Sequence, residues 1–508
     1  MQRHGIVKEH ISKRLRIQRK GFLCVVLLLF FLCIVSIRIF QKDKQGRNGS
    51  MTKESLRDTA REKIEHQKLS QEIRVLIRNS SYEGLYHDHL EIRSEVELLA
   101  DDGREERSVP AGESIHLHKG DKVLGEGTVL TIAPKAGTGR LSVINLVRSQ
   151  GNPSYVGRLE IREMEEGLLL INILPMEEYL CGVLPSEMPA SFPEEALKAQ
   201  AICARTYACK KMLQPGYPEL KADLYDSTAF QVYGNLEEQE SCTKAVRATN
   251  GLVLVKADGS LMDTYYYSTS CGRGTSAMAW QKEEWANTEE LAGRNISRSA
   301  MQKMLQKRSY QKKEQEKGTE KAGEAPPRNM ENEADFLLVE NLDDYEATLP
   351  WYRWSYQVEQ IDCAEMAKRI QKVLGITEEV IFHEVLTMQV TRRAIGGAAW
   401  ELKVITDQGN YVVRGEHAIR EVLCDGKTEV VQRDGTRVMC SLLLPSAFFL
   451  METSAKGENV VGYSLNGGGL GHGIGMSQNA AGIMAEEGHS AEEILAFFYE
   501  GGRLHDIE

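Results

Sequence analysis

The sequence predicts an α+β protein that consists of an amino-terminal transmembrane helix, a β-rich region and a mixed helix–strand domain with a charged insertion. Three observations support this fold class: one apolar run near the amino terminus, a series of short β-type runs, and helix-start patterns that alternate with strands further along. With 508 residues and 42% hydrophobic residues, the chain is long and apolar enough to form several domains with their own cores.

The apolar run lies at residues 21–40, and Gly21–Ile37 contains no charged residue. This length is at the short end for a membrane-spanning helix. Residues 1–20 are rich in Lys and Arg, and the positive-inside rule therefore places them in the cytoplasm and the rest of the chain outside. No small-residue cleavage site follows Ile37. We therefore expect an uncleaved, single-pass anchor in the cell membrane, with a cleaved signal peptide as the alternative.

Polar residues dominate residues 41–71, which we expect to form a stalk. Residues 72–160 follow as a β-rich region, because short runs of β-type residues alternate there with turn residues. The expected strands are Ile73–Ile77, Leu90–Leu98, Val123–Ile132 and Leu141–Val147, and the region ends in a hairpin formed by Gly157–Arg162 and Gly167–Ile173.

The remaining residues, 161–508, are expected to form the mixed helix–strand domain. Its first helix starts at Pro175 and runs towards Val183, because proline suits the first turn of a helix. The second helix has Ser191 as its N-cap, and Glu194 completes a capping box. Small residues recur in this second helix at helical spacing and predict a narrow face for close packing: Leu197, Ala201, Ala204 and Ala208.

Strands and helices continue on both sides of a charged, low-complexity insertion at residues 282–334, which we expect to be exposed and partly helical. Before the insertion we expect a helix at Cys242–Thr249 and strands at Gly251–Val255 and Leu261–Thr269. After it we expect a helix at Cys363–Leu374, strands at Val385–Arg392, Trp400–Ile405 and Tyr411–Val413, a glycine-rich loop at Gly467–Gly475, a helix from Ser477, and a last helix with a capping box from Ser490 to Glu493.

Glu187 is a candidate for chemistry because Pro185 and Pro189 enclose it at the junction of the two expected helices. A carboxyl group in a rigid, partly apolar corner loses hydration, and its pKa rises because burial disfavours the charged form. A raised pKa suits a general acid. Since a glutamate between prolines is also a common surface-turn residue, spacing alone leaves both interpretations open.

His472 lies in the glycine-rich segment Gly469–Gln478, just before an expected helix. Glycines permit unusual backbone angles and the close approach of a ligand. The spacing of these glycines does not match a nucleotide-binding loop. His472 is therefore a candidate site residue, with a structural histidine in a tight turn as the alternative.

Other polar groups have the composition of a sugar site, although each is also common in turns and at strand ends. They are Asp223, Asp226, Ser227, Gln231, Tyr233 and the strand end Ser268–Ser270. The motifs of zinc proteases and of α/β hydrolases are absent from the sequence, which counts against both classes.

Composition argues against a nucleic-acid partner, because the formal net charge is -11 and the basic stretch is confined to the amino terminus. Metal binding is not expected at the histidine pairs His87/His89 and His116/His118, because no suitable Cys, Asp or Glu cluster lies near them. Spacing leaves open whether Cys242 and Cys271 form a disulfide.

Several segments carry a joint pattern: Leu174–Leu180 with Gly182–Pro189, Glu195–Ala201 with Ala204–Tyr207, Asp226–Ser227 with Gln231–Gly234, Tyr267–Ser270, and Gly471–Gln478. Together they resemble the family of stage II sporulation protein D and the amidase enhancer. The resemblance covers roughly residues 160–280 and 335–503. The combination of motifs is highly specific, whereas any single one is not.

This resemblance implies a lytic transglycosylase that cleaves peptidoglycan glycan strands and leaves 1,6-anhydro-muramic acid ends. For this chain we expect no cofactor. The resemblance also implies substrate strands without stem peptides and a cell-wall amidase as partner during engulfment in sporulation. By motif position, Glu187 matches the catalytic glutamate of the family. Further residues expected in the substrate cleft are Lys198, Gln200, Arg205, Gln231, Ser268, Thr269, His472 and Gln478.

The sequence departs from the family pattern in three places. Some members carry a zinc site where this chain has Leu220–Phe230, which contains neither His nor Cys, so we expect no metal there. The insertion at residues 282–334 and Asn479, where an aromatic residue is common, are the other two. The main alternative function is a non-catalytic protein that binds glycan and activates an amidase, and the third is a scaffold in an engulfment complex.

Overall fold

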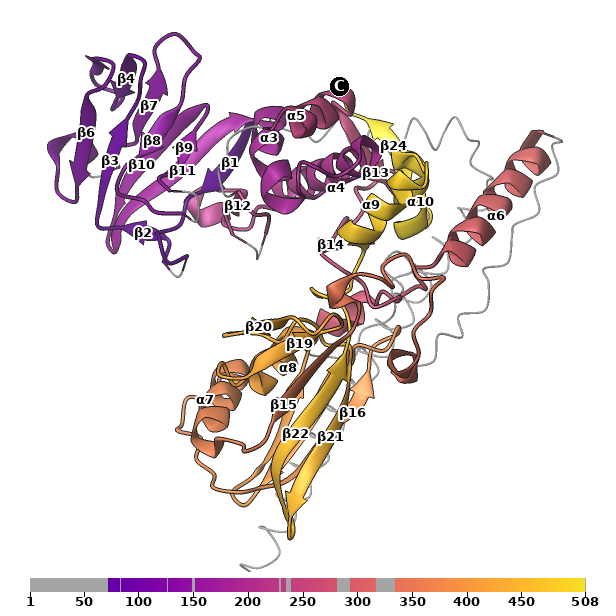
Figure 1. Ribbon diagram of the computed structural model, residues 1–508. Helices are drawn as coiled ribbons and strands as arrows, with labels where there is room; N and C mark the ends of the chain where they lie inside the picture. The colour runs from indigo at the N-terminus through magenta and orange to yellow at the C-terminus, as the bar shows by residue number, and fades with distance from the viewer. Residues whose placement is uncertain are drawn as a thin grey trace, which may run out of the picture. The chain divides into compact units, whose positions relative to one another are not determined.

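The computed structural model describes residues 72–507 except for 83, 126, 149–150, 228–229, 234–238, 281–292 and 317–333 (Figure 1). The expected cytoplasmic tail, transmembrane anchor and stalk, residues 1–71, lie outside this part of the chain. Within the described residues, no helix combines the length and the apolar character that a bilayer crossing requires.

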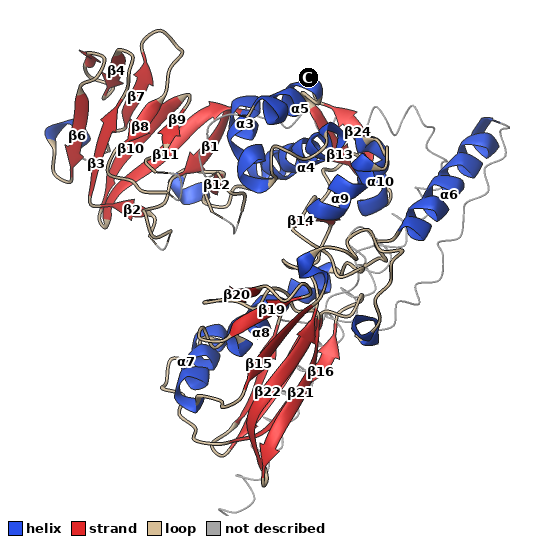
Figure 2. Ribbon diagram, in the orientation of Figure 1, coloured by secondary structure: helices blue, strands red, loops and turns tan. Residues whose placement is uncertain are grey.

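Helices and strands alternate through the described residues, which confirms the α+β fold class (Figure 2). The β-rich region contains β1 (Glu72–Leu76), β2 (Tyr86–His87), β3 (His89–Arg93), β4 (Leu98–Asp101), β5 (Glu106–Val109), β6 (Ser114–His118), β7 (Leu130–Pro134), β8 (Leu141–Val143), β9 (Ser154–Tyr155), β10 (Arg158–Met164) and β11 (Gly167–Pro175). With β12 (Leu224–Tyr225), they form a sheet of order β12-β1-β11-β10-β7-β4-β5, in which β2 also pairs with β11, and a second sheet of order β6-β3-β8-β9.

The expected hairpin is confirmed as β10 and β11, which pair in antiparallel register with Arg158 opposite Ile173. Only part of the expected strand Val123–Ile132 is extended, because Lys122–Leu124 forms a 3-10 turn before β7. Strand β11 is buried along nearly its whole length, which explains its continuous apolar run.

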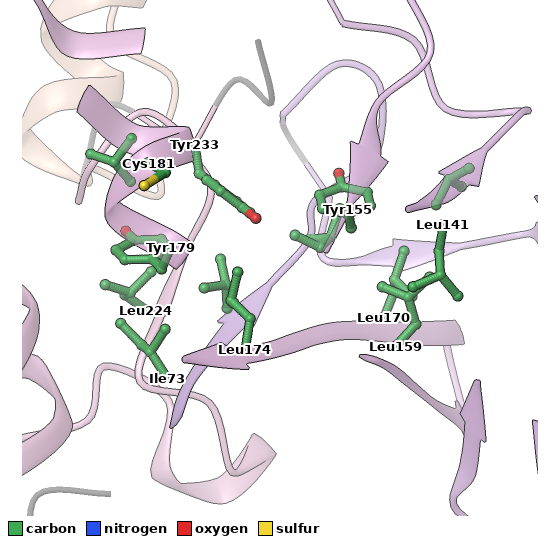
Figure 3. Close-up of a cluster of buried hydrophobic side chains, with 14 of the residues drawn as sticks. Ile73, Leu141, Tyr155, Leu159, Leu170, Leu174, Tyr179, Cys181, Leu224 and Tyr233 are labelled. Carbon is green, nitrogen blue, oxygen red and sulfur yellow. The ribbon is translucent and has the colours of Figure 1, made fainter. Parts of the chain in front are cut away.

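The next elements are α3 (Met176–Glu187), α4 (Glu194–Leu213), α5 (Glu240–Ala248), β13 (Leu252–Val255), β14 (Tyr266–Tyr267), β23 (Met476–Ser477), α9 (Gln478–Glu486), α10 (Ala491–Phe498) and β24 (Arg503–Asp506). Helix α3 follows β11 directly and shares a core with the large sheet, where Tyr179 and Tyr233 belong to the same cluster as Leu174 (Figure 3). This core fixes the direction in which α3 leaves the sheet.

Three expectations for the helices α3 and α4 are wrong. Helix α3 continues past Val183 and includes Pro185, so that Glu187 is its last residue. Ser191 does not cap α4, because the extended residue Pro193 is the N-cap and no side chain caps the helix. The buried face of α4 is not narrow, since α3, α5, α9, α10 and β13 pack around it and bury most of its residues.

Two small sheets connect distant parts of the chain. β13 pairs with β24 in antiparallel register, and β14 pairs with β23 in parallel register, with Tyr266 opposite Met476. The expected strand Leu261–Thr269 is therefore reduced to two residues and two isolated bridges at its ends. The capping box from Ser490 to Glu493 at the start of α10 is confirmed.

The carboxy-terminal half contains a large sheet of order β18-β17-β16-β22-β15-β19-β20, and β21 pairs with β22. Its elements are β15 (Trp354–Val358), α7 (Cys363–Leu374), β16 (Val385–Arg393), β17 (Ala399–Thr406), β18 (Asn410–Arg414), α8 (Glu416–Leu423), β19 (Glu429–Gln432), β20 (Arg437–Met439), β21 (Phe449–Lys456) and β22 (Asn459–Gly467). The expected helix Cys363–Leu374 and the strands that follow it agree with the structure to within about two residues at each end.

The charged insertion includes α6 (Arg298–Glu316). The expectation that the whole insertion is exposed is wrong at its amino-terminal part, because Ile296 and Met301 are fully buried against residues of α9 and α10. Cys242 and Cys271 are free thiols that belong to different hydrophobic clusters, so the open question of a disulfide between them is answered in the negative.

Candidate functional site

A cavity of about 240 Å³ lies at the end of α3. Its walls come from segments that are far apart in the sequence: Glu187, Tyr207, Phe230, Val232, Thr264–Tyr267, Trp280, Gly471 and His472. Most of these side chains are aromatic, and Glu187 is the lone carboxyl group among the residues that line the cavity. A largely apolar cavity with a few polar groups is the usual form of a small-ligand site.

Glu187 is held by two neutral hydrogen-bond donors. The backbone N–H of Val232 donates to its Oε1 at 2.5 Å, and the side chain of Tyr266 forms a second hydrogen bond. Burial raises the pKa of Glu187 to about 7, because the loss of hydration outweighs the stabilisation of the carboxylate by these two donors. Near neutral pH, the residue is therefore present in both its protonated and its ionised form.

Gln231 and Tyr266 form a hydrogen-bonded support for this carboxyl group. The Nε2 of Gln231 is 3.2 Å from the hydroxyl of Tyr266, and its Oε1 accepts a hydrogen bond from Tyr179. Burial raises the pKa of Tyr266 far above its usual value, so the phenol stays neutral and acts as a donor. Gln231 thus orients Tyr266, and Tyr266 in turn contacts Glu187.

Gln478 contacts Glu187 although it lies 291 residues further along the chain. It is the first residue of α9, and its Nε2 donates to the backbone carbonyl oxygen of Glu187 at 2.9 Å. The side chain therefore fixes the end of α3, where that carbonyl has no partner within the helix. Glu187 and the glycine-rich segment that precedes Gln478 therefore lie at the same cavity.

His472 lines the cavity, and its imidazole ring is uncharged at neutral pH. Its Nδ1 accepts a hydrogen bond from the backbone N–H of Ile474 at 3.1 Å, so the proton of the ring lies on Nε2, and the ring also bonds to the backbone of Tyr266. Its ring centroid lies 4.8 Å from that of Trp280. Burial lowers the pKa of His472 to about 4, which keeps the imidazole uncharged at neutral pH.

The glycines around His472 permit close packing of the loop. A Cβ atom at Gly475 would lie 1.9 Å from the carbonyl oxygen of Tyr265, and the φ of Gly475 is +79°. Glycine is the residue that accepts both conditions without strain. The loop can therefore pass directly over the strand that carries Tyr266.

The segment that contains Glu187 is similar to a known family. Residues 164–255, which include Glu187, match the family described as stage II sporulation protein. This part of the chain is therefore similar to the stage II sporulation protein D and amidase enhancer family. Residues 299–475 match a second family, described as a domain of unknown function, DUF8618.

Two relatives from Bacillus subtilis (strain 168) show how far the family likeness extends. The amidase enhancer is 28% identical over 351 residues, a match that covers 64% of this chain and 40% of the relative. Stage II sporulation protein D is 26% identical over 349 residues, which is 66% of this chain and 76% of the relative. Stage II sporulation protein D from Bacillus amyloliquefaciens is 33% identical over 121 residues, 21% of this chain and 35% of that protein.

Ser268 and Thr269, two of the expected cleft residues, lie beside the cavity and are not among the residues that line it. Their hydroxyl oxygens are 3.1 Å apart, and Asn479 donates to the Thr269 hydroxyl at 3.0 Å and to the Ser268 carbonyl at 3.1 Å. Asn479, the departure from the family pattern, therefore ties the first turn of α9 to this strand end.

Three expected cleft residues on α4 also lie outside the set that lines the cavity. Arg205 is fully buried and forms a bidentate ion pair with Glu177 at 2.7 Å, which anchors α4 to α3. Lys198 pairs with the adjacent glutamates of the first turn of α4. Gln200 is fully buried, and neither polar atom of its side chain has a hydrogen-bond partner in the described part of the chain.

Tyr266 and Trp280, which line the cavity, belong to none of the motifs that carry the family resemblance, and Tyr207 stands only at the end of one. Tyr266 belonged to an expected strand, where an aromatic residue is unremarkable. The neighbouring motif Tyr267–Ser270 could have drawn attention to Tyr266. The sequence does not show, however, that β14 pairs with β23 and so brings this motif beside His472.

Proposed function

We propose that the protein is a peptidoglycan lytic transglycosylase, anchored in the cell membrane with its body outside the cytoplasm. It would act on glycan strands without stem peptides during cell-wall remodelling in sporulation and engulfment. One observation carries the enzymatic part of this proposal: Glu187 faces an aromatic cavity, has a pKa near neutral, and has no cation within ion-pair distance among the described residues.

The reaction needs one group that first donates and then accepts a proton. Protonated Glu187 gives its proton to the oxygen of the glycosidic bond between N-acetylmuramic acid and N-acetylglucosamine as the bond to C1 breaks. The resulting carboxylate takes the proton of the muramic acid 6-hydroxyl while that oxygen bonds to C1. The product is a 1,6-anhydro ring, and no water is consumed, so the second carboxylate of a hydrolase is not required.

Electrostatics of the cavity single out Glu187 for this role. Burial raises the pKa of Tyr265 to about 12 and that of Tyr267 well above its usual value, while it lowers the pKa of His472 to about 4. Among the lining residues, Glu187 therefore has the pKa closest to neutral pH. A general acid–base works best when its pKa is near the operating pH.

Two donors are placed to stabilise the ionised intermediate form of Glu187. The Val232 N–H and the Tyr266 hydroxyl both contact its carboxyl group, and neither has to move when the charge appears. Aromatic rings on the cavity wall, including Tyr207 and Trp280, offer apolar faces to sugar rings and exclude water.

The decisive experiment incubates the full chain with stem-peptide-free glycan strands and analyses the products by mass spectrometry. We expect anhydro-muramic ends from the wild type and a loss of about 10²–10⁴-fold in rate for Glu187→Gln, the size typical of a general acid–base group. Glu458→Gln, an exposed turn residue, is the matched control and should retain full activity. Reducing ends from the wild type, or full activity of Glu187→Gln, would contradict the proposal.

A second candidate function is a non-catalytic glycan-binding activator of a cell-wall amidase. The 28% identity to a protein named amidase enhancer supports it. The two candidates predict different results when purified amidase and intact peptidoglycan are incubated with the full chain. A pure activator increases amidase turnover equally as wild type and as Glu187→Gln, and it forms no anhydro ends.

A further inference from the structure

Glu346 is a fully buried carboxyl group that the proposed reaction does not use. It lies in the segment between α6 and β15, and no cation lies within ion-pair distance of it in the described part of the chain. Its neighbours are three donors from two serines. The backbone N–H of Ser270 donates to Oε1 at 2.9 Å, the Ser270 hydroxyl donates to Oε2, and the Ser477 hydroxyl donates to Oε1 at 2.8 Å.

These two serines belong to the strands that pass beside the cavity. Ser477 is the second residue of β23, and Ser270 follows β14 closely. The two strands share one short parallel register, Tyr266 opposite Met476 and Tyr267 opposite Ser477. Because so short a pairing has little stability of its own, its geometry depends on what holds its ends. Glu346 bonds to both strand segments at that end.

The same pair of strands delivers two side chains to Glu187. Tyr266 of β14 contacts the carboxyl group, and Gln478, the residue directly after β23, holds the backbone carbonyl of Glu187 at 2.9 Å. A shift of β14 against β23 would therefore change both contacts at once. Displacements of about 1 Å at such a site can reduce a rate by about 10².

We infer that Glu346 is a positioning residue for the Glu187 site, which acts by clamping Ser270 and Ser477 so that Tyr266 and Gln478 stay in contact with Glu187. The clamp connects the two matched segments through Ser270 and Ser477, which lie outside both. Glu346 lies within residues 299–475, while Glu187 lies within residues 164–255. The second region thus contributes to the site although Glu346 is not among the residues that line the cavity.

Asp344 provides an internal comparison. It is also a buried acid in the same segment, but its side chain bonds to the Tyr352 hydroxyl at 2.7 Å and to Asn341 at 2.9 Å, and to neither strand of the clamp. A general need for buried acids in this segment would make both residues equally important to the Glu187 site. The clamp makes Glu346 alone important to it.

The test compares four single variants of the full chain and the double variant of Glu346→Leu with Ser477→Ala. Glu346→Leu removes both acceptor oxygens, whereas Glu346→Gln keeps one acceptor for Ser477 and the Ser270 N–H and can donate to the Ser270 hydroxyl. Ser477→Ala removes one arm of the clamp, and Asp344→Asn is the matched control. Thermal melting identifies any variant that fails to fold. If Glu346→Leu does not fold, Ser477→Ala carries the test.

The first readout is the pKa of Glu187, measured from its side-chain carboxyl resonance in protein labelled with ¹³C-glutamate and assigned with Glu187→Gln. Loss of the Tyr266 hydrogen bond removes a donor that stabilises the carboxylate, so Glu346→Leu and Ser477→Ala should raise this pKa. Glu346→Gln and Asp344→Asn should leave it unchanged. This readout does not depend on turnover, so it tests the clamp even if the wild type forms no anhydro ends and the proposed function fails.

The second readout rests on the proposed function and separates kcat from KM on glycan strands. We expect kcat to fall by about 10² in Glu346→Leu, less in Ser477→Ala, and no further when the two changes are combined, with KM little changed. Glu346→Gln should restore most of the rate. An unaltered Glu187 pKa and unaltered kcat in folded Glu346→Leu or Ser477→Ala would overturn the inference, as would an equal effect of Asp344→Asn.

Discussion

Glu187 and Asp226 are two carboxyl groups of the same matched segment, and they differ in their charged partners and in their access to a cavity. Asp226 has a buried cation: its Oδ2 is 2.7 Å from the guanidinium of Arg148, and both side chains are almost fully buried. Asp226 also accepts a hydrogen bond from the backbone N–H of Arg78 at 3.0 Å. Glu187 accepts hydrogen bonds from neutral donors, has no cation within ion-pair distance among the described residues, and faces a cavity.

This difference separates a carboxyl group that holds the fold from one that can exchange a proton. The Asp226–Arg148 pair joins β12 to the β-rich region, and a change of charge there would leave the partner ion buried alone. Glu187 can gain or lose a proton without leaving a buried counterion unpaired. We therefore expect changes at Asp226 to affect stability and changes at Glu187 to affect rate.

The largest stability effect is expected for Asp226→Asn. The variant keeps the size of the side chain but leaves Arg148 buried without its counterion, which should reduce the free energy of unfolding by about 3–5 kcal/mol. The midpoint of urea denaturation measures this loss. Activity on glycan at a temperature well below melting should stay near that of the wild type.

A double variant, Asp226→Asn with Arg148→Met, is the control for this prediction. It removes both charges and fills the space with an apolar side chain, so it should recover part of the lost stability. A single variant that is as stable as the wild type, or one that loses activity while it remains folded, would show that Asp226 belongs with Glu187 after all.

Glu187→Gln, in contrast, should be more stable than the wild type at neutral and alkaline pH. The folded pKa of Glu187 is about 7 and its ordinary value is 4.5, so the folded protein holds this proton more tightly than the unfolded chain. Below pH 4.5 both states are protonated, and the residue does not destabilise the fold. Between pH 4.5 and 7 the unfolded chain ionises first, and the wild type loses up to about 3 kcal/mol as pH rises.

Glutamine cannot ionise, so the free energy of unfolding of Glu187→Gln should not decrease in this way as pH rises. We expect equal melting temperatures of variant and wild type well below pH 4.5 and a higher melting temperature of the variant at pH 8. Calorimetric scans across this pH range provide the measurement. A variant that melts below the wild type at pH 8 would mean that the carboxylate stabilises the fold, as at Asp226.

Local patterns in the sequence predicted much of the fold and the central residue of the site. The hairpin β10–β11, helix α7 and the capping box at Ser490 depend on neighbouring residues, and the structure confirms them. Glu187 was found because a distinctive motif surrounds it. The burial that raises its pKa comes from segments far apart in the sequence, as do the donors Val232 and Tyr266.

The residues that sequence reasoning missed depend on pairings between distant segments. Tyr266 reaches Glu187 only because β14 pairs with β23, and Glu346 follows a charged stretch that suggested an exposed surface. Arg205, in contrast, was expected in the substrate cleft and is buried in the protein core instead. A motif residue can serve packing, and composition alone does not distinguish the fully buried ion pair with Glu177 from a substrate contact.

The smallest expected effects concern two aromatic residues, one in the Glu187 cavity and one beside the Asp226–Arg148 pair. Trp280 lines the Glu187 cavity, its ring centroid lies 4.5 Å from that of Tyr265, and its Nε1 donates to Glu416 at 3.2 Å. If the ring supports a sugar, Trp280→Ala should raise KM for glycan about tenfold, equivalent to ~1.4 kcal/mol, with less effect on kcat.

Tyr82 is the matched aromatic residue on the Asp226 side, where the guanidinium of Arg148 lies 4.2 Å from its ring centre. Tyr82→Ala should reduce the melting temperature and leave KM unchanged, because its ring interacts with a structural cation rather than with a cavity. Trp280→Phe should retain most of the affinity, since it keeps an aromatic face. An unchanged KM in Trp280→Ala would place the sugar elsewhere and would restrict the comparison to the two carboxyl groups.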